Sequence, residues 1–110
     1  LQLYADQVFC FTPNGAVIRL PKRATPIDFA YAVHTDLGDT CTGCKINGKH
    51  LPLQTHLRNG DLVEILSSTK KSPSYHWLSY AKTGKARSAI RRYWHDKLPV
   101  QNESKLFNCF

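Results

Sequence analysis

The sequence predicts an α+β fold in which one helix lies across a mixed sheet. Two short β-type runs flank a tight-turn signal, a single helix pattern with start and stop signals follows, and three further short strand patterns come after it. The element order is therefore β-β-α-β-β-β. A helix packed on a mixed sheet whose last strand lies in the centre is the β-grasp arrangement, which we predict for residues 1–66.

The first two strands are predicted to form a hairpin. Residues 8–11 and 17–20 are short runs of β-branched, aromatic and apolar side chains. Asn14-Gly15 lies between them, and an Asn-Gly pair between such runs favours a tight hairpin turn.

One helix is predicted over residues 26–37. Thr25 offers a capping hydroxyl, Pro26 suits the first helical position, and Gly38 is a stop signal. The side chains that share one arc of this helix are Phe29, Ala30, Val33 and Leu37. We expect this arc to pack on the inner face of the hairpin.

Strands are predicted at residues 41–46, 50–53 and 62–66, and residues 67–74 indicate a polar, proline-containing linker.

A basic helical segment, 75–98, follows, with a short helix and then a second one that Thr83 can cap. One face of the second helix carries Ala86, Ala89, Ile90, Tyr93 and Trp94. This face has to dock on another part of the protein. The tail, 99–110, is expected to be poorly ordered.

The charge is concentrated in the second part of the chain. Residues 1–66 contain as many basic as acidic side chains, whereas residues 67–110 carry the whole formal net charge of +7. Such asymmetry is typical of a neutral module joined to a segment that faces a polyanion.

Cys41 and Cys44 have the C-x-x-C spacing of zinc and redox sites, and His34, His50 and His56 lie near them in the sequence. A structural zinc site needs four converging ligands, but the chain has one such cysteine pair. Two strand residues three apart should also point to opposite faces. A redox pair would stand at the start of a helix. We therefore predict buried packing thiols, with no metal and no cofactor.

Nothing in the sequence predicts a catalytic centre. A chain of 110 residues builds one modest core, and it contains no glycine-rich phosphate loop, no nucleophile elbow and no carboxylate pair on a shared face. We expect this chain not to be an enzyme by itself. No apolar run approaches the roughly 18 residues that cross a membrane, so we expect no membrane partner and a cytoplasmic location. The chain lacks Met, which suggests a piece of a longer protein.

Five stretches carry a resemblance to a known family: VFCFTPNG, LPKRATPIDFAYAVHTDLG, the NGK turn, LRNGDLVEI and WLSYAKTGKARSAIRRYW. Together they resemble the TGS domain and the start of the following helical domain of the RelA/SpoT family, the synthetases and hydrolases of the alarmone (p)ppGpp. The resemblance runs from about Asp6 to Lys97. It departs from the family after Lys97, and at Cys44, where the family usually has a small residue.

The resemblance implies a regulatory role, because the family's catalytic domains lie outside the matched region. It implies that the chain senses the CCA 3′ end of deacylated tRNA on the ribosome. His34 would donate to and stack on the terminal nucleotides, while Val63 and Ile65 close the space beyond the terminal ribose. Position alone leaves another interpretation open, in which His34 only stabilises the end of a helix.

The basic helix is predicted to contact RNA phosphates, because residues 82–92 contain no acid and aromatic residues flank them. The predicted contacts are Lys82, Lys85, Arg87, Arg91 and Arg92. A solvated face that only keeps the protein in solution is the simpler alternative. Two rival partners remain open: an acidic protein such as acyl carrier protein, and the catalytic domains of the parent enzyme.

Overall fold

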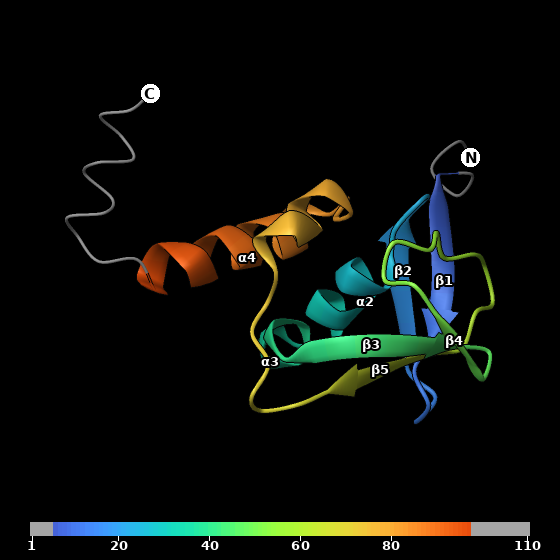
Figure 1. Ribbon diagram of the computed structural model, residues 1–110. Helices are drawn as coiled ribbons and strands as arrows, with labels where there is room; N and C mark the ends of the chain where they lie inside the picture. The colour runs from blue at the N-terminus through green and yellow to red at the C-terminus, as the bar shows by residue number, and fades with distance from the viewer. Residues whose placement is uncertain (1–5, 98–110) are drawn as a thin grey trace.

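The computed structural model describes residues 6–97, with side chains as far as residue 95, so the predicted tail lies outside the described part. The elements are β1 (Gln7–Phe11), β2 (Val17–Pro21), α2 (Pro26–Val33), α3 (Thr35–Asp39), β3 (Cys41–Ile46), β4 (Lys49–Leu51), β5 (Val63–Ser67), the 3₁₀ helix η1 (Tyr75–Ser79) and α4 (Gly84–Lys97) (Figure 1). Within this part, none of the helices has the length and apolar character needed to span a bilayer.

The strands form two antiparallel sheets that meet at one edge. β1 pairs with β2, and β3 lies between β4 and β5. A parallel bridge joins Phe11 to Leu62, and two backbone hydrogen bonds extend this contact, from Phe11 N to Asp61 O at 2.8 Å and from Gly60 N to Phe9 O at 2.7 Å. The chain leading into β5 therefore lies beside β1, which places β5 between β1 and β3. This is the predicted β-grasp order.

α2 lies across the sheets, as Figure 1 shows, and contributes Phe29 to the main core. This core consists of Val8, Cys10, Leu20, Ala24, Phe29, Cys44, Ile46, Leu57 and Val63, all buried. Both predicted turns have the geometry that their sequences favour. Gly15 has φ 93°, and Asn47 and Gly48 have φ 53° and 86°, the left-handed values that such turns require.

The predicted helix over residues 26–37 is two helices, so that prediction is wrong in one respect. α2 ends at Val33, and His34 has extended backbone, with φ −166° and ψ 141°. Gly38 does not stop a helix but lies within α3, where a Cβ atom would stand 2.4 Å from the Tyr31 ring. The break has a tertiary cause, because the chain must bend to lay Gly38 on that ring.

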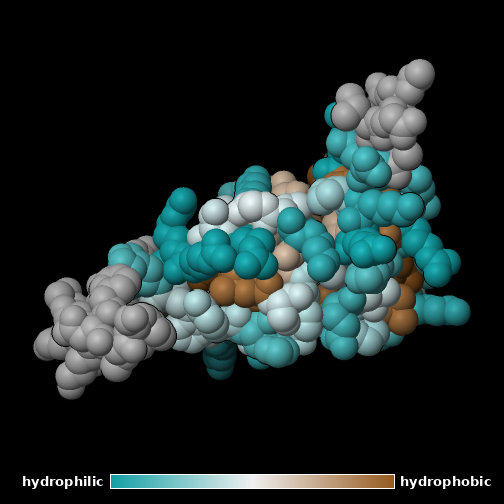
Figure 2. Space-filling model, turned by 90° about the horizontal axis from the view of Figure 1, so that it is seen from above, coloured by the Kyte–Doolittle hydropathy of each residue, from teal (hydrophilic) through white to brown (hydrophobic). Residues whose placement is uncertain are grey.

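The helical segment docks on the β-grasp unit, as its apolar face requires. A second buried cluster joins α2 and β3 to η1 and α4, and its members are Ile27, Tyr31, Cys41, Trp77, Ala81, Ala86 and Ile90. Pro73 of the predicted linker is also fully buried, and Ser68 N donates to Thr40 O at 2.9 Å. The two parts therefore share a core. Hydrophilic side chains cover most of the face that Figure 2 shows.

Candidate nucleic-acid interface

His34 stands exposed at the bend between α2 and α3. Two thirds of its side chain, 67%, is accessible. Its Nδ1 accepts a hydrogen bond from Asp36 N at 3.1 Å, so the imidazole caps α3, and a neutral ring that accepts at Nδ1 carries its proton on Nε2. The exposed ring therefore offers a flat face and an N–H donor. His34 lies at the end of α2, as predicted, and it also begins α3.

The bend under His34 is fixed from below by Tyr31. The Tyr31 ring is fully buried beneath Gly38, and its hydroxyl donates to Asp39 Oδ1 at 2.8 Å. Burial raises the pKa of Tyr31, and it also raises the pKa of Asp39, although the Tyr31 hydrogen bond acts on Asp39 in the opposite direction. Thr40 Oγ1 donates to Asp36 O at 2.7 Å. These contacts hold His34 in position before any ligand arrives.

Val63 and Ile65 face the interior. Val63 is fully buried in the main core, and Ile65 is half-buried and packs against both clusters. Glu64 between them is exposed. Alternation along β5 thus turns both predicted contact side chains away from solvent, so an RNA end could meet Val63 only through its backbone. The alternating sequence Val-Glu-Ile already carries this signal.

Four of the five predicted phosphate contacts are available. Lys82, Lys85, Arg91 and Arg92 are exposed. Arg87 is different, because its Nη1 donates to Leu78 O at 2.6 Å and to Ala81 O at 3.3 Å. Arg87 therefore fastens η1 to α4. Trp94 is half-buried, packing against the second cluster.

One carboxylate joins the two parts of the protein. Asp28 is fully buried and accepts hydrogen bonds from five groups. The donors are Thr25 N (3.0 Å), Thr25 Oγ1 (3.4 Å), Lys82 N (2.9 Å), Thr83 N (3.0 Å) and Thr83 Oγ1 (3.0 Å). Thr83 Oγ1 in turn accepts from Ala86 N at 3.2 Å, as its predicted cap role requires. Asp28 thus caps α2 and holds the start of α4, which sets where Lys82 and α4 lie.

Cys41 and Cys44 do not point to opposite faces, and the reason is a β-bulge. Cys41 pairs with Ser67 and Cys44 with Ile65, two residues apart on β5, because the register shifts between Cys41 and Gly43. Both thiols are buried towards α2, Cys41 beside Tyr31 and Cys44 in the main core. Among the described residues, no three His, Cys, Asp or Glu side chains are placed to hold a metal ion together.

We expect the buried thiols to resist modification in the folded protein. Burial raises the pKa of Cys10 and of Cys41 to about 11, and it raises the pKa of Cys44. Since the thiolate is the reactive form, all three should stay unlabelled by iodoacetamide at pH 8 and react in denaturant, as peptide mapping would show. An unfolded thiol ionises at lower pH than a folded one, so stability should fall as the pH rises from about 9 to about 11. Rapid native labelling of Cys41 would contradict this packing.

Comparison with known proteins identifies the family of this chain. Residues 8–67 match the TGS domain family. The chain is 61% identical over 92 residues to GTP pyrophosphokinase rsh of Brucella ovis, which covers 84% of this chain and 12% of that protein. It is 50% identical over 93 residues to GTP pyrophosphokinase of Myxococcus xanthus, with 84% and 12% covered.

A third relative carries the name of the opposite reaction. Over 91 residues the chain is 48% identical to guanosine-3′,5′-bis(diphosphate) 3′-pyrophosphohydrolase of Aquifex aeolicus, covering 83% of this chain and 13% of that protein. The chain thus spans about an eighth of the length of these relatives, and that eighth contains the TGS domain. The chain belongs to the TGS domain family, in the form that RelA/SpoT-type enzymes carry.

Proposed function

We propose that this chain is the regulatory RNA-binding module of a (p)ppGpp synthetase/hydrolase and senses the CCA 3′ end of deacylated tRNA on the ribosome, in the cytoplasm. The observation that carries the proposal is the exposed His34 ring on a bend held rigid by Tyr31 and Asp39. A pre-positioned flat ring with one N–H donor suits stacking on, and hydrogen bonding to, a terminal nucleotide.

In this proposal, the protein recognises the free 3′ end of the tRNA because an aminoacylated end would not fit. The backbone of β5 between Val63 and Ile65 would close the space beyond the terminal ribose, and an attached amino acid would have to displace packed chain. Discrimination then comes from a clash with aminoacyl-tRNA. Lys85, Arg91 and Arg92, exposed on α4, would add phosphate contacts that strengthen binding without selecting the end.

The test is a pair of substitutions at His34. We expect His34→Ala and His34→Asn each to weaken binding of deacylated tRNA by about 1–3 kcal/mol, the scale of one lost stacking contact. Asparagine is a good helix cap, so His34→Asn keeps the acceptor for Asp36 N and removes the ring alone. The measurement belongs on ribosomal A-site complexes of the full-length enzyme, and His50→Ala, another exposed histidine, is the control.

Two results would overturn the sensor mechanism. One is unchanged binding of deacylated tRNA by His34→Asn. The other is wild-type binding of aminoacyl-tRNA as tight as that of deacylated tRNA. In either case, pull-down with acyl carrier protein and with the enzyme's own catalytic domains would test the two rival partners, both of which need an acidic surface opposite the basic helix.

A further inference from the structure

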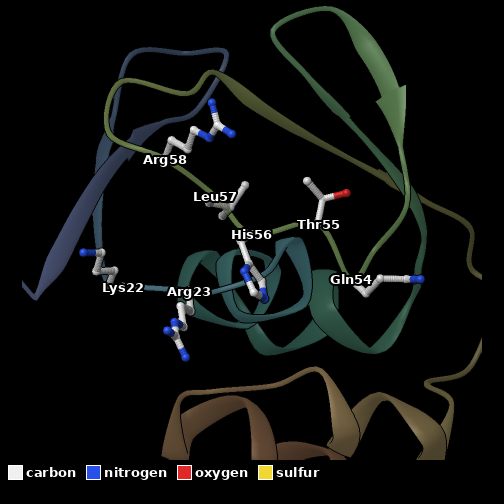
Figure 3. A pocket seen from close by; sticks show the side chains of 7 residues that line it. All are labelled: Lys22, Arg23, Gln54, Thr55, His56, Leu57 and Arg58. Atoms are coloured by element: carbon white, nitrogen blue, oxygen red, sulfur yellow. The ribbon is translucent and has the colours of Figure 1, made fainter.

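A basic cleft lies beside the start of α2, away from His34. Its volume is about 470 Å³, and it is lined by Lys22, Arg23, Gln54, Thr55, His56, Leu57 and Arg58. Leu57 forms the buried floor, where its N–H donates to Ala24 O at 2.8 Å and joins the two loops that build the cleft. Figure 3 shows His56 in the middle, with Lys22, Arg23, Gln54 and Arg58 around it.

The cations of this cleft are not neutralised by the described part of the protein. No carboxylate lines it, and among residues 6–95 no Asp or Glu side chain lies within ion-pair distance of Lys22, Arg23 or Arg58. Asp61, in an adjoining hollow that shares Thr55, His56 and Arg58, is already engaged by Arg58 N at 2.9 Å and Asn47 Nδ2 at 3.0 Å. Unpaired cations around a concavity focus a positive potential that attracts anions.

Arg23 adopts a backbone conformation that favours glycine. Its φ is 74°, in the left-handed region, where a side chain is held at a conformational cost. Strain of this kind concentrates at functional sites. Glycine would adopt the backbone conformation at residue 23 with less strain than arginine. An arginine at this position is therefore compatible with a function of its guanidinium at the rim of the cleft.

The arrangement suits several phosphates rather than a single anion. The charged ends spread around the rim in Figure 3 rather than converging on one point, as a single anion would require. Asp28 also holds the backbone of exposed Lys82 beside Thr25, two residues along the chain from Arg23. Leu57, the hydrophobic residue of the cleft, is buried, and the other lining side chains are polar or charged.

We propose that this cleft binds the phosphodiester backbone of single-stranded RNA, through Lys22, Arg23 and Arg58 with His56 as a stacking surface. The proposal shares its RNA ligand with the proposed function, but it concerns a different surface and does not require a CCA end. The cleft would bind the RNA strand regardless of its sequence, and His34 would recognise the 3′ end.

The experiment measures the affinity of the 110-residue chain for oligouridine of about 12 nucleotides at several salt concentrations. Each phosphate contact contributes about 0.7 to the log–log salt slope for single strands. The double variant Lys22→Ala/Arg58→Ala should flatten the slope by about 1.4. The double variant Lys70→Ala/Lys71→Ala removes the same charge from another exposed loop, and it should leave the slope unchanged.

Arg23→Gly separates binding from folding. It should flatten the slope by about 0.7, while the Tm stays unchanged or rises because glycine accepts the positive φ. His50→Ala changes an exposed histidine outside both proposed sites and should bind oligouridine as the wild type does. Because oligouridine carries no CCA end, a failed His34 experiment leaves the salt slopes of the cleft variants standing, and the reverse also holds.

Three outcomes would overturn the proposal. Equal flattening in the cleft variant and the Lys70/Lys71 control would assign RNA binding to net charge. If the chain does not bind oligouridine at low salt, single-stranded RNA is not the ligand of the cleft. The third outcome is that the chain binds polyglutamate and the cleft variants lose this binding, while they bind oligouridine as the wild type does. That result would assign the cleft to an acidic protein instead.

Discussion

Replacing Asp28 by alanine is expected to lower the free energy of unfolding by about 3–5 kcal/mol, the scale for leaving buried polar partners of a carboxylate unpaired. The change removes the acceptor of Thr25 N, Lys82 N and Thr83 N together. Asp28→Asn should also destabilise, because its amide would present an N–H group to donors. Chemical denaturation measures both effects.

The matched control is Asp36→Ala, which removes a carboxylate whose side chain is 88% exposed. We expect a change of at most about 1 kcal/mol there. A loss below about 1 kcal/mol for Asp28→Ala would mean that water replaces these hydrogen bonds and that the carboxylate does not join the two parts. Tryptophan fluorescence should also shift to the red in Asp28→Ala if the helical segment loosens, since Trp77 is buried in the shared cluster and Trp94 packs against it.

Gly38→Ala is the second large effect, and its expected sign is opposite to helix propensity. Gly38 lies in α3 without a positive φ, so propensity alone would stabilise the alanine variant by about 1 kcal/mol. The new Cβ would instead stand 2.4 Å from Tyr31 Cδ1, and the ring is too buried to move aside. We expect a net loss of about 1–3 kcal/mol in chemical denaturation.

Gly84→Ala is the control, because nothing lies within 4 Å of a Cβ atom at this first position of α4. It should be neutral or stabilising. If Gly38→Ala were also neutral or stabilising, the Tyr31 ring would not be the cause of the bend. Since the same bend carries His34, Gly38→Ala should in addition weaken tRNA binding in the full-length enzyme more than its loss of stability explains.

The sequence predicts those elements whose signals are local. The Asn14-Gly15 turn, the start of α2 at Thr25 and Pro26, and the cap of α4 by Thr83 each depend on residues within a few positions. Long-range contacts decide the rest. Asp28 looks like an ordinary first-turn acid. Its hydrogen bonds to Lys82 and Thr83, which lie 54 and 55 positions further along the chain, leave no signal in the sequence.

The candidate site divides in the same way. The family resemblance identified His34, whereas the bend that presents it follows from the packing of Gly38 on Tyr31. The basic cleft was missed because the net charge of residues 1–66 is zero. That sum conceals where the charges lie: Asp28 is occupied by hydrogen-bond donors, Asp36 lies beside His34, Asp39 accepts from Tyr31, and Lys22, Arg23 and Arg58 line the cleft.

The shared core couples α4 to the β-grasp unit, so that α4 would move as a rigid arm of that unit. Asp28 fixes its first turn, Ala86 and Ile90 seat its middle, and the far end projects away from the β-grasp unit in Figure 1. Its 14 residues span roughly 21 Å. A tilt of about 10° imposed on the β-grasp unit by a docked RNA would therefore swing the Lys97 end by about 4 Å, given that length. If RNA binds as proposed, occupancy at one end of the molecule would become displacement at the other, with no hinge needed between them.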